Sequence, residues 1–244
     1  MKFEYGKEIP ISVPELVDPK HSALLIIDVQ NDYAKMNGRL LYPQLVKNLV
    51  RMVEAARRAG ILVLYIQDTV LRDRLSDSPA WIRHYMLGES KRDPSEIGTG
   101  GLDGTKGQEI IDEIRPQQNE IIIKKFRSSA FVGTCLDLIL RSNNIKSIVV
   151  TGLFTEGCVE STCRDASNEY FVVLAEDCVH SDRKELPVRG PAACAHHHIQ
   201  RLRIPNRHRA PAARRVGKSH PWPVRCSTSM TSPRLMLTQS RPSR

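Results

Sequence analysis

The sequence has 244 residues, which is enough for one substantial α/β domain and too few for two of ordinary size. It has no apolar run of membrane-spanning length, and its first residues, MKFEYGKEIP, lack the apolar core of a secretion signal, so we expect a soluble cytoplasmic protein. The net charge of +9 is uneven, because residues 186–244 hold eleven Arg, one Lys and no acidic residue, whereas residues 1–185 are slightly acidic.

The first half of the sequence predicts a strand, a helix and a second strand. Residues 1–20 are expected to be an irregular lead-in that contains three prolines. The apolar run ALLII at 23–27 is typical of a parallel strand that is covered on both faces. Apolar side chains recur at helical spacing over 46–56, and Gly60 is a good helix stop. The run ILVLYI at 61–66 is the second buried strand, so these elements predict a right-handed βαβ unit.

Residues 69–105 form a long stretch without periodicity. A long loop on a compact domain is usually functional, so we interpret this stretch as a substrate lid. Its glycine-rich segment GTGGLDG at 98–104 is not a phosphate-binding loop, because it lacks the terminal Gly-Lys-Ser/Thr and follows no strand.

Three further strands are predicted after the lid. A short helix at 107–114 precedes the strand EIIIKKF at 120–126. An amphipathic helix at 131–143 leads to a strand at 147–151, and the run YFVVLA at 170–175 is the fifth. Strands that alternate with helices in this way predict a doubly wound, Rossmann-like parallel sheet of five to six strands, flanked by helices in three α/β/α layers.

The pattern stops abruptly near residue 185, so we place the domain at 1–185 and a basic, Pro- and Arg-rich tail at 186–244. Three interpretations of the tail remain open: a disordered extension, a nucleic-acid-binding extension, or an out-of-frame C-terminus. Nucleic acid is the least favoured, since Trp222 is nearly the only aromatic residue available for stacking. The histidine triplet at 196–198 is only weak evidence for a metal site, because three adjacent histidine side chains do not easily face one ion.

Three predicted strands end in residues that can do chemistry. Asp28 follows the first strand, Lys124 and Lys125 end the third, and Cys158 follows the fourth. The carboxyl ends of parallel strands share one edge of the sheet, where ligands bind. A carboxylate, an ammonium and a thiol together make an activated nucleophile. The structural alternatives are a capping Asp28 and an ion pair that only packs the edge.

The six cysteines show no CxxC spacing, so we expect free thiols and neither a zinc site nor a disulfide framework. Cys158 falls near the start of a predicted helix, where the thiol should ionise more readily than free cysteine. The alternative is a small buried hydrophobic residue at a strand-helix corner.

Three segments together resemble the isochorismatase-like cysteine hydrolases. These are ALLIIDVQNDY at 23–33, KFRSSAF at 125–131 and TGLFTEGCVESTCRDA at 151–166, and the resemblance covers about residues 20–180. The family includes nicotinamidases, N-carbamoylsarcosine amidases, ureidoacrylate amidohydrolases and biuret hydrolases. The resemblance implies an Asp-Lys-Cys triad in which Asp28 is the general base and Cys158 the nucleophile, and the register of the second motif selects Lys125 over Lys124.

The resemblance also implies how the triad would be used. A cis peptide would join Leu153 to Phe154, and the backbone N–H groups of Phe154 and Cys158 would form the oxyanion hole. Cys158 would attack an amide or ureido carbonyl, and a thioester would then be hydrolysed, with no cofactor and no metal.

Departures from the family pattern narrow the substrate. Nicotinamidases carry two histidines close behind a metal-binding Asp, whereas Asp68 is followed by no histidine before His84. The TxxCVEST pattern is closest to the ureidoacrylate, biuret and carbamoylsarcosine groups. We therefore predict hydrolysis of a C–N bond in a small ureido, carbamoyl or amide compound, with a nicotinamidase-type amidase or a non-catalytic binding protein of the same fold as alternatives. The side chains expected near the substrate are Tyr33, Gln67, Trp81, His84 and Arg127.

The predicted partners follow from the same features. We expect a small-molecule substrate, no membrane partner and no nucleic acid, and the resemblance implies a homo-oligomer, either a dimer or a tetramer.

Overall fold

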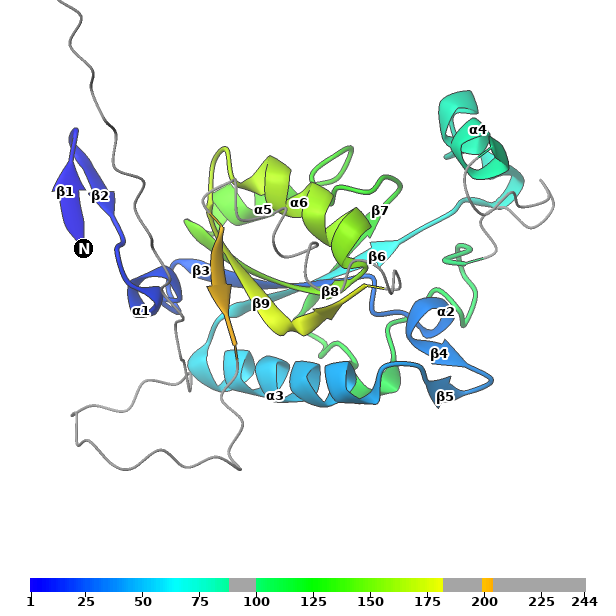
Figure 1. Ribbon diagram of the computed structural model, residues 1–244, viewed down its shortest axis with the longest axis horizontal. Helices are drawn as coiled ribbons and strands as arrows, with labels where there is room; N and C mark the ends of the chain where they lie inside the picture. Colours follow the sequence, from blue (N-terminus) through cyan, green and yellow to red (C-terminus); the bar gives the residue numbers. More distant parts are fainter. Residues whose placement is uncertain (88–99, 182–198, 204–244) are drawn as a thin grey trace, which may run out of the picture.

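A six-stranded parallel sheet forms the centre of the protein (Figure 1). The computed structural model describes residues 1–87, 100–181 and 199–203. The strand order across the sheet is β10-β9-β8-β3-β6-β7, and every neighbouring pair is parallel. The strands are β3 (Ser22–Ile27), β6 (Leu62–Asp68), β7 (Ile121–Lys125), β8 (Ser147–Leu153), β9 (Phe171–His180) and β10 (Gln200–Leu202). The predicted doubly wound α/β fold is confirmed.

Helices cover both faces of this sheet (Figure 1). On one face lies α3 (Pro43–Ala59), and on the other lie α5 (Leu136–Ser142) and α6 (Glu160–Ala166). As predicted, α3 ends at Gly60, which adopts the left-handed conformation that glycine tolerates best. All six residues of β3 are buried, because this strand has a neighbour on each side and helices on both faces.

At the carboxyl ends of β3 and β8, Gly152 pairs with Ile27 and has no room for a side chain. Gly152 has φ +114, and a Cβ atom built on it would lie 2.0 Å from the Ile27 carbonyl oxygen. No side chain fits here, so glycine is required. This contact sets the spacing between Asp28, which follows Ile27, and the turn that carries Cys158.

The segments outside the sheet differ from the prediction in several places. The lead-in is not irregular: it forms the hairpin β1 (Lys2–Glu4) and β2 (Lys7–Ile9) and the helical turn α1 (Val13–Leu16). Ser12 and Glu15 form a capping box at α1, which the prediction of an irregular lead-in does not include. Short elements follow β3, namely α2 (Asn31–Ala34), β4 (Lys35–Met36) and β5 (Arg39–Leu40).

Two predicted helices are shorter than expected. Residues 107–114 contain only the 3-10 turn η2 (Asp112–Ile114), because the backbone at Ile110 pairs with Gln30 instead. The helix predicted at 131–143 begins at Leu136, since Gly133 takes a positive φ of 70°.

The predicted lid is partly described. It contains the turn η1 (Arg72–Arg74) and α4 (Pro79–Leu87), which projects from the body of the protein in Figure 1. Residues 88–99 lie outside the described residues, as do the side chains of His84 and Tyr85.

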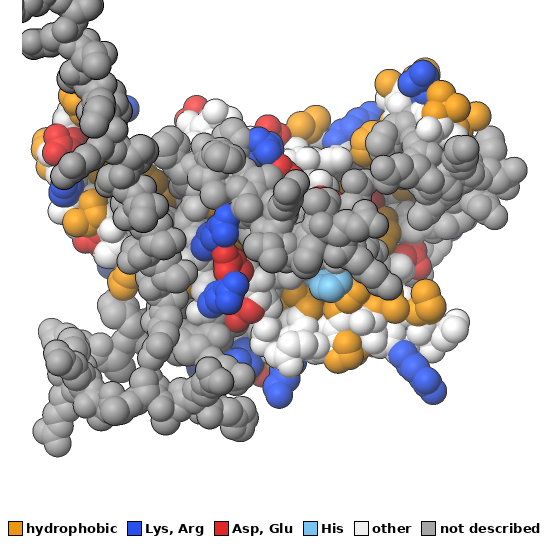
Figure 2. Space-filling model, viewed as in Figure 1, with side chains coloured by type: hydrophobic (Ala, Val, Ile, Leu, Met, Phe, Trp, Pro, Cys, Tyr) orange, Lys and Arg blue, Asp and Glu red, His pale blue; other side chains and the backbone are white. Residues whose placement is uncertain are grey.

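Strand β10 lies within the segment predicted to be the tail. It pairs with β9, and Leu202 is buried against the core on the α3 side. Arg201 and Arg203 form ion pairs with Glu176, and Figure 2 shows side chains of both charges next to one another on this face. The His196–His198 triplet and residues 204–244 lie outside the described residues. None of the described helices is both long and apolar enough to cross a bilayer.

Candidate active site

Asp28 lies at the carboxyl end of β3 with its side chain inside the protein. Its backbone takes a φ of +54°, and its N–H donates to the Ile66 carbonyl oxygen of β6. The residue is 3 % exposed. Asp28 Oδ2 lies 2.9 Å from Lys125 Nζ, and Oδ1 has no hydrogen-bond partner among the described residues. Lys125 therefore holds the carboxylate through Oδ2, and the Cys158 side chain also hydrogen-bonds to this carboxylate.

Lys125 ends β7 and is completely buried, which is rare for a lysine. Its ammonium group lies 2.9 Å from Asp28 Oδ2 and 2.9 Å from Asp68 Oδ1, and it donates to Cys158 Sγ at 3.2 Å. An ammonium group has three hydrogens, so these three acceptors account for all of them. Lys124, by contrast, faces away and pairs with Asp103 at 2.6 Å near the surface.

Cys158 lies in the π-helical turn η3 (Thr155–Val159) that joins β8 to α6. The peptide bond between Leu153 and Phe154 is cis, as the resemblance implied. Cys158 lies near the start of the helical segment after β8, as predicted, but its turn is π-helical and the α-helix α6 begins two residues later. The Ala130 backbone N–H donates to the buried Thr162 hydroxyl at 3.0 Å, which ties the KFRSSAF segment to α6.

The charges of the site favour a thiol over a thiolate. Asp28, Asp68 and Lys125 together carry one net negative charge, so ionising the thiol would add a second in a buried place. Burial and the Asp28 charge accordingly raise the pKa of Cys158 well above its ordinary value. The expectation that this thiol ionises more readily than free cysteine is therefore wrong.

The carboxylate and the ammonium respond to the same surroundings. Burial raises the pKa of Asp28 to about 6, against the attraction of Lys125 and with the repulsion of Asp68. Although burial opposes it, the charges of Asp28 and Asp68 hold the pKa of Lys125 well above its usual range. At neutral pH the site thus holds a carboxylate, an ammonium and a thiol.

Asp68 is a member of this cluster that the sequence reasoning missed. It ends β6, where it lies opposite Lys125 in the sheet register. The available signal was strand alternation: Asp68 and Gln67 must face opposite ways, and the prediction chose Gln67. Gln67 precedes Asp68 on the strand and so faces the opposite side of the sheet, where its amide donates to the Gln108 carbonyl oxygen at 2.9 Å. The role of Gln67 near the substrate stays a prediction.

Aromatic rings lie beside the turn that carries Cys158. Tyr33 meets Phe154 edge to face, with ring centroids 6.4 Å apart, and Tyr42 does the same from another side. His180, at the end of β9, lies against the Tyr42 ring at 4.1 Å. Of these residues, the sequence reasoning named Tyr33 and Phe154 but not Tyr42 or His180.

The roles of the other residues expected near the substrate stay predictions. Trp81 is on α4, where its backbone N–H donates to the Ser78 hydroxyl, and its role stays a prediction. The side chain of His84 lies outside the described part of the chain. Arg127, two residues after Lys125, donates to the Ser76 carbonyl oxygen at 2.8 Å and lines a cavity of about 310 Å³.

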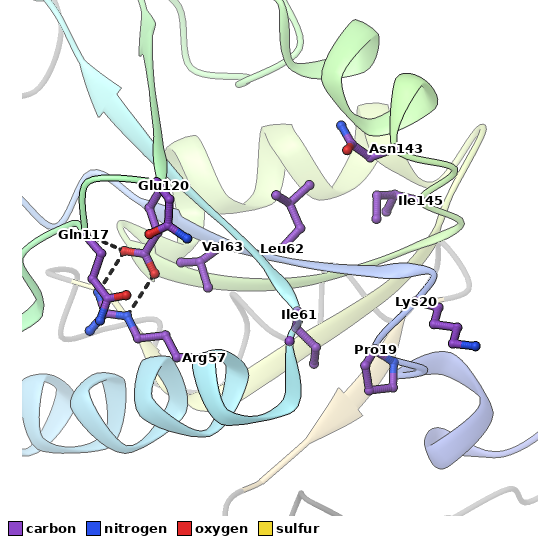
Figure 3. Close-up of a pocket in the computed structure, with 12 residues that line it drawn as sticks. Pro19, Lys20, Arg57, Ile61, Leu62, Val63, Gln117, Glu120, Asn143 and Ile145 are labelled. Carbon is purple, nitrogen blue, oxygen red and sulfur yellow. Dashed lines mark hydrogen bonds and ion pairs between the residues drawn. The ribbon is translucent and has the colours of Figure 1, made fainter.

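A larger cavity of about 440 Å³ lies at the opposite end of the sheet, where the strands begin (Figure 3). It is bounded by the start of β6 at 61–63 and by the segments at 19–20 and 117–120. Three charged residues line it, namely Lys20, Arg57 and Glu120, and the last two pair with each other at 2.8 Å. Ligands of open parallel sheets bind at the carboxyl ends of the strands, so we assign the chemistry to the Asp28 edge.

The acidic, histidine and cysteine side chains of the described residues form no group of three or more that could hold a metal ion. The cluster of Asp28, Lys125 and Cys158 has one cation already occupying its centre. Its donor set suits acid-base and nucleophilic chemistry.

Comparison with known proteins identifies a family and relatives of this chain. Residues 22–189 match the isochorismatase domain family. The chain is 34% identical to ureidoacrylate amidohydrolase RutB from Variovorax paradoxus over 193 residues, which cover 72% of this chain and 77% of that protein. Among solved structures, N-carbamoylsarcosine amidase from Thermoplasma acidophilum is 28% identical with a TM-score of 0.59, covering 74% and 96% of the two chains. Nicotinamidase PncA from Bacillus subtilis is 26% identical with a TM-score of 0.57, covering 72% and 93%.

Proposed function

The chain belongs to the isochorismatase family of hydrolases, and from that premise we propose that it is a cysteine-dependent amidohydrolase. The proposed substrate is a small ureido, carbamoyl or amide compound, and the bond that breaks is a C–N bond. The proposed nucleophile is Cys158, with Asp28 as the general base and Lys125 as the group that holds both.

In the first half-reaction the thiol proton moves to Asp28 while Cys158 Sγ forms a bond to the carbonyl carbon. The carbonyl π electrons move to oxygen, which the backbone N–H groups of Phe154 and Cys158 would stabilise. When the tetrahedral intermediate collapses, the C–N bond breaks and Asp28 returns its proton to the leaving nitrogen. Ammonia or an amine departs, and a thioester remains.

In the second half-reaction water hydrolyses this thioester. Asp28 takes a proton from the water as its oxygen attacks the thioester carbonyl, and the C–S bond then breaks. Asp28 returns the proton to the sulfur, so the enzyme ends in the thiol and carboxylate state with which it began. The chemistry needs no redox partner.

The observation that carries this proposal is the position of Lys125. One buried ammonium lies 2.9 Å from the Asp28 carboxylate and 3.2 Å from the Cys158 sulfur, so both reacting groups share one anchor. Placing a nucleophile and its base at hydrogen-bonding range of a common group is what acyl transfer needs. The unpartnered Oδ1 of Asp28 supports its role as a base, since this oxygen is available to a proton.

The relatives favour a ureido or carbamoyl substrate. Ureidoacrylate amidohydrolase and N-carbamoylsarcosine amidase are both named for substrates that contain an N–C(=O)–N or carbamoyl group. A nicotinamidase-type activity is the second candidate, supported by the Bacillus subtilis structure. The described residues near Asp68 offer no histidine pair for a metal, which ranks this candidate lower.

The test is ammonia release from ureidoacrylate, biuret, N-carbamoylsarcosine and nicotinamide, by the wild-type chain and by Cys158→Ala. We expect turnover of at least one ureido or carbamoyl compound, and its loss in Cys158→Ala with an unchanged circular dichroism spectrum. The matched control is Cys135→Ala, which removes an exposed thiol and should keep full activity. Substantial ammonia release by Cys158→Ala would reject the mechanism.

Non-catalytic binding is the alternative of a different class. It predicts that the substrates bind, as seen by a rise in melting temperature, while no ammonia is released. Two further predictions concern the whole protein, namely a homodimer or homotetramer and a place in the cytoplasm. Light scattering and cell fractionation would test them.

A further inference from the structure

The carboxylate of Asp68 lies on the side of Lys125 away from Asp28. Its Oδ1 is 2.9 Å from Lys125 Nζ, which equals the distance on the Asp28 side. The lysine is therefore held between two carboxylates, and its remaining N–H reaches Cys158. Without Asp68, one N–H of a fully buried ammonium would lose its acceptor, which is costly in the protein interior.

Asp68 is itself fixed by contacts from the segment that follows β3. The Gln30 side chain pairs with both backbone groups of Asp68: its amide donates to the carbonyl oxygen at 2.9 Å and its oxygen accepts from the N–H at 2.8 Å. The Tyr33 hydroxyl donates to Asp68 Oδ2 at 2.8 Å. One carboxylate oxygen is thus oriented by Tyr33 and the other by Lys125.

We propose that Asp68 is a positioning residue of the triad, which acts through Lys125 to aim its ammonium group and to keep the buried site at a net charge of −1. This inference rests on the proposed function for its meaning in catalysis. The net charge has a chemical purpose in that reaction: it holds the proton on Cys158 at rest and makes Asp28 a stronger base.

The groups that face Asp28 come from four elements. They are Lys125 on β7, Asp68 on β6, Cys158 on η3 and Tyr33 on α2. Among them, Asp68 is the one negative group whose charge can be removed without touching a proposed reacting atom. The repulsion from Asp68 also raises the pKa of Asp28 and of Cys158, which agrees with the geometry.

The test is the pH dependence of alkylation at Cys158 in the full chain, measured with iodoacetamide and read at the level of the Cys158 peptide by mass spectrometry. In Asp68→Asn we expect the midpoint of alkylation to fall by about one pH unit or more, so that the rate near neutral pH rises by up to about tenfold. The acid limb of ammonia release should move to lower pH in the same variant.

Two further variants separate charge from packing. Asp68→Glu keeps the charge and should leave the alkylation midpoint close to that of the wild type. Asp103→Asn removes a carboxylate that pairs with Lys124, the neighbour of Lys125 on the outer face of the same strand, and should change neither profile. If Asp68→Asn does not fold, Asp68→Ser leaves room for a water molecule beside Lys125 and takes its place.

An alkylation midpoint in a folded Asp68→Asn or Asp68→Ser equal to that of the wild type would overturn the proposal and leave Asp68 as an anchor for Tyr33. This readout needs no turnover. Failure of the proposed amidohydrolase activity would appear instead as ammonia release that survives Cys158→Ala, so the two outcomes are distinguishable.

Discussion

At the scale of single residues, the protonation of Asp28 decides when the proposed reaction can run. A general base must be ionised, and burial raises the pKa of Asp28 to about 6. We therefore expect kcat/KM to rise about tenfold per pH unit up to about pH 6 and to level off above it. The measurement is kcat/KM from pH 4.5 to 8 on the best ureido substrate. A profile that stays flat down to pH 4.5 would contradict the role of Asp28.

The same shift has the opposite effect on stability. The folded pKa of Asp28 lies above its ordinary value of 3.8, so the protonated form stabilises the fold. That contribution is complete below pH 3.8 and is lost as the pH rises through about 6. The ionised form of Asp28, which the proposed reaction needs as a base, is thus the form that lowers the stability of the fold. Such a shift is typical of functional sites.

Lys125 and Lys124 are adjacent in sequence and offer a matched pair for testing what burial does to a charge. Lys125→Met leaves Asp28 beside Asp68 without their shared cation, so we expect a loss of about 3 kcal/mol or more in the free energy of unfolding at pH 8. The loss should shrink at pH 5, where Asp28 can take a proton. Lys124→Met removes an exposed ion pair and should cost about 0.5 kcal/mol or less.

Urea denaturation at both pH values measures these differences. Equal losses for the two lysine variants at pH 8 would show that Lys125 does not neutralise the carboxylates in the way the geometry implies. Ammonia release should be lost in Lys125→Met and kept in Lys124→Met, since only Lys125 contacts Cys158.

At the scale of elements, the contact between β3 and β8 controls the geometry of the site. Gly152→Ala would place a methyl group 2.0 Å from the Ile27 carbonyl oxygen and 2.6 Å from the Ile27 backbone nitrogen. The alanine would also have to adopt the φ of +114° that Gly152 has. The strands would have to separate, so we expect a loss of about 3 kcal/mol or more, together with loss of activity.

The matched control for this prediction is Gly157→Ala, which alters the adjacent turn where a Cβ atom meets nothing within 4 Å. Thermal unfolding should show a change of less than about 1 kcal/mol for this variant. A Gly152→Ala protein as stable as the wild type would mean that the two strands are not as tightly apposed as the structure has them.

The elements that could be predicted are those whose sequence pattern is strong by itself. Strands β3, β6 and β8 are nearly continuous apolar runs, and α3 repeats its apolar residues at helical spacing up to Gly60. The hairpin β1-β2 and the strand β10 are three residues per strand, too short for any periodicity to appear. Their pairing depends on neighbours that a single sequence does not reveal.

The candidate site, like the fold, could be predicted only in part. Asp28, Lys125 and Cys158 lie at strand ends, so topology alone brings them to one edge, and the motif register chose between two lysines. Asp68 was missed because a strand end offers two adjacent polar residues, and only the register with Lys125 shows which one faces inward. The acidity of Cys158 was misjudged because sequence shows the nearby helix but not the net charge around the sulfur.

At the scale of the whole molecule, the polar groups at the two ends of the strands have different roles. At the edge where the strands begin, Arg57 and Glu120 satisfy each other beside the larger cavity (Figure 3). At the edge where they end, Lys125 connects two carboxylates and a thiol. The fold thus places its proposed reactive groups at the carboxyl ends of the strands, whereas Arg57 and Glu120 form an ion pair with each other at the opposite end.

The sixth strand tests where the folded domain ends. Ile199 and Leu202 are 7% and 3% exposed and pack into the two core clusters on opposite faces of the sheet.

Burying an aliphatic side chain stabilises by about 1.5–3 kcal/mol, so a chain that ends at residue 185 should lose about 3 kcal/mol and expose the edge of β9 to aggregation. A chain that ends at residue 206 keeps β10 and should unfold in urea at the midpoint of the full chain. In the full chain, Leu202→Ala should cost about 2 kcal/mol or more, whereas Gln200→Ala, which truncates an exposed side chain of the same strand, should cost little. If the chain ending at 185 is as stable as the full chain, β10 adds nothing, and the boundary predicted from the sequence stands.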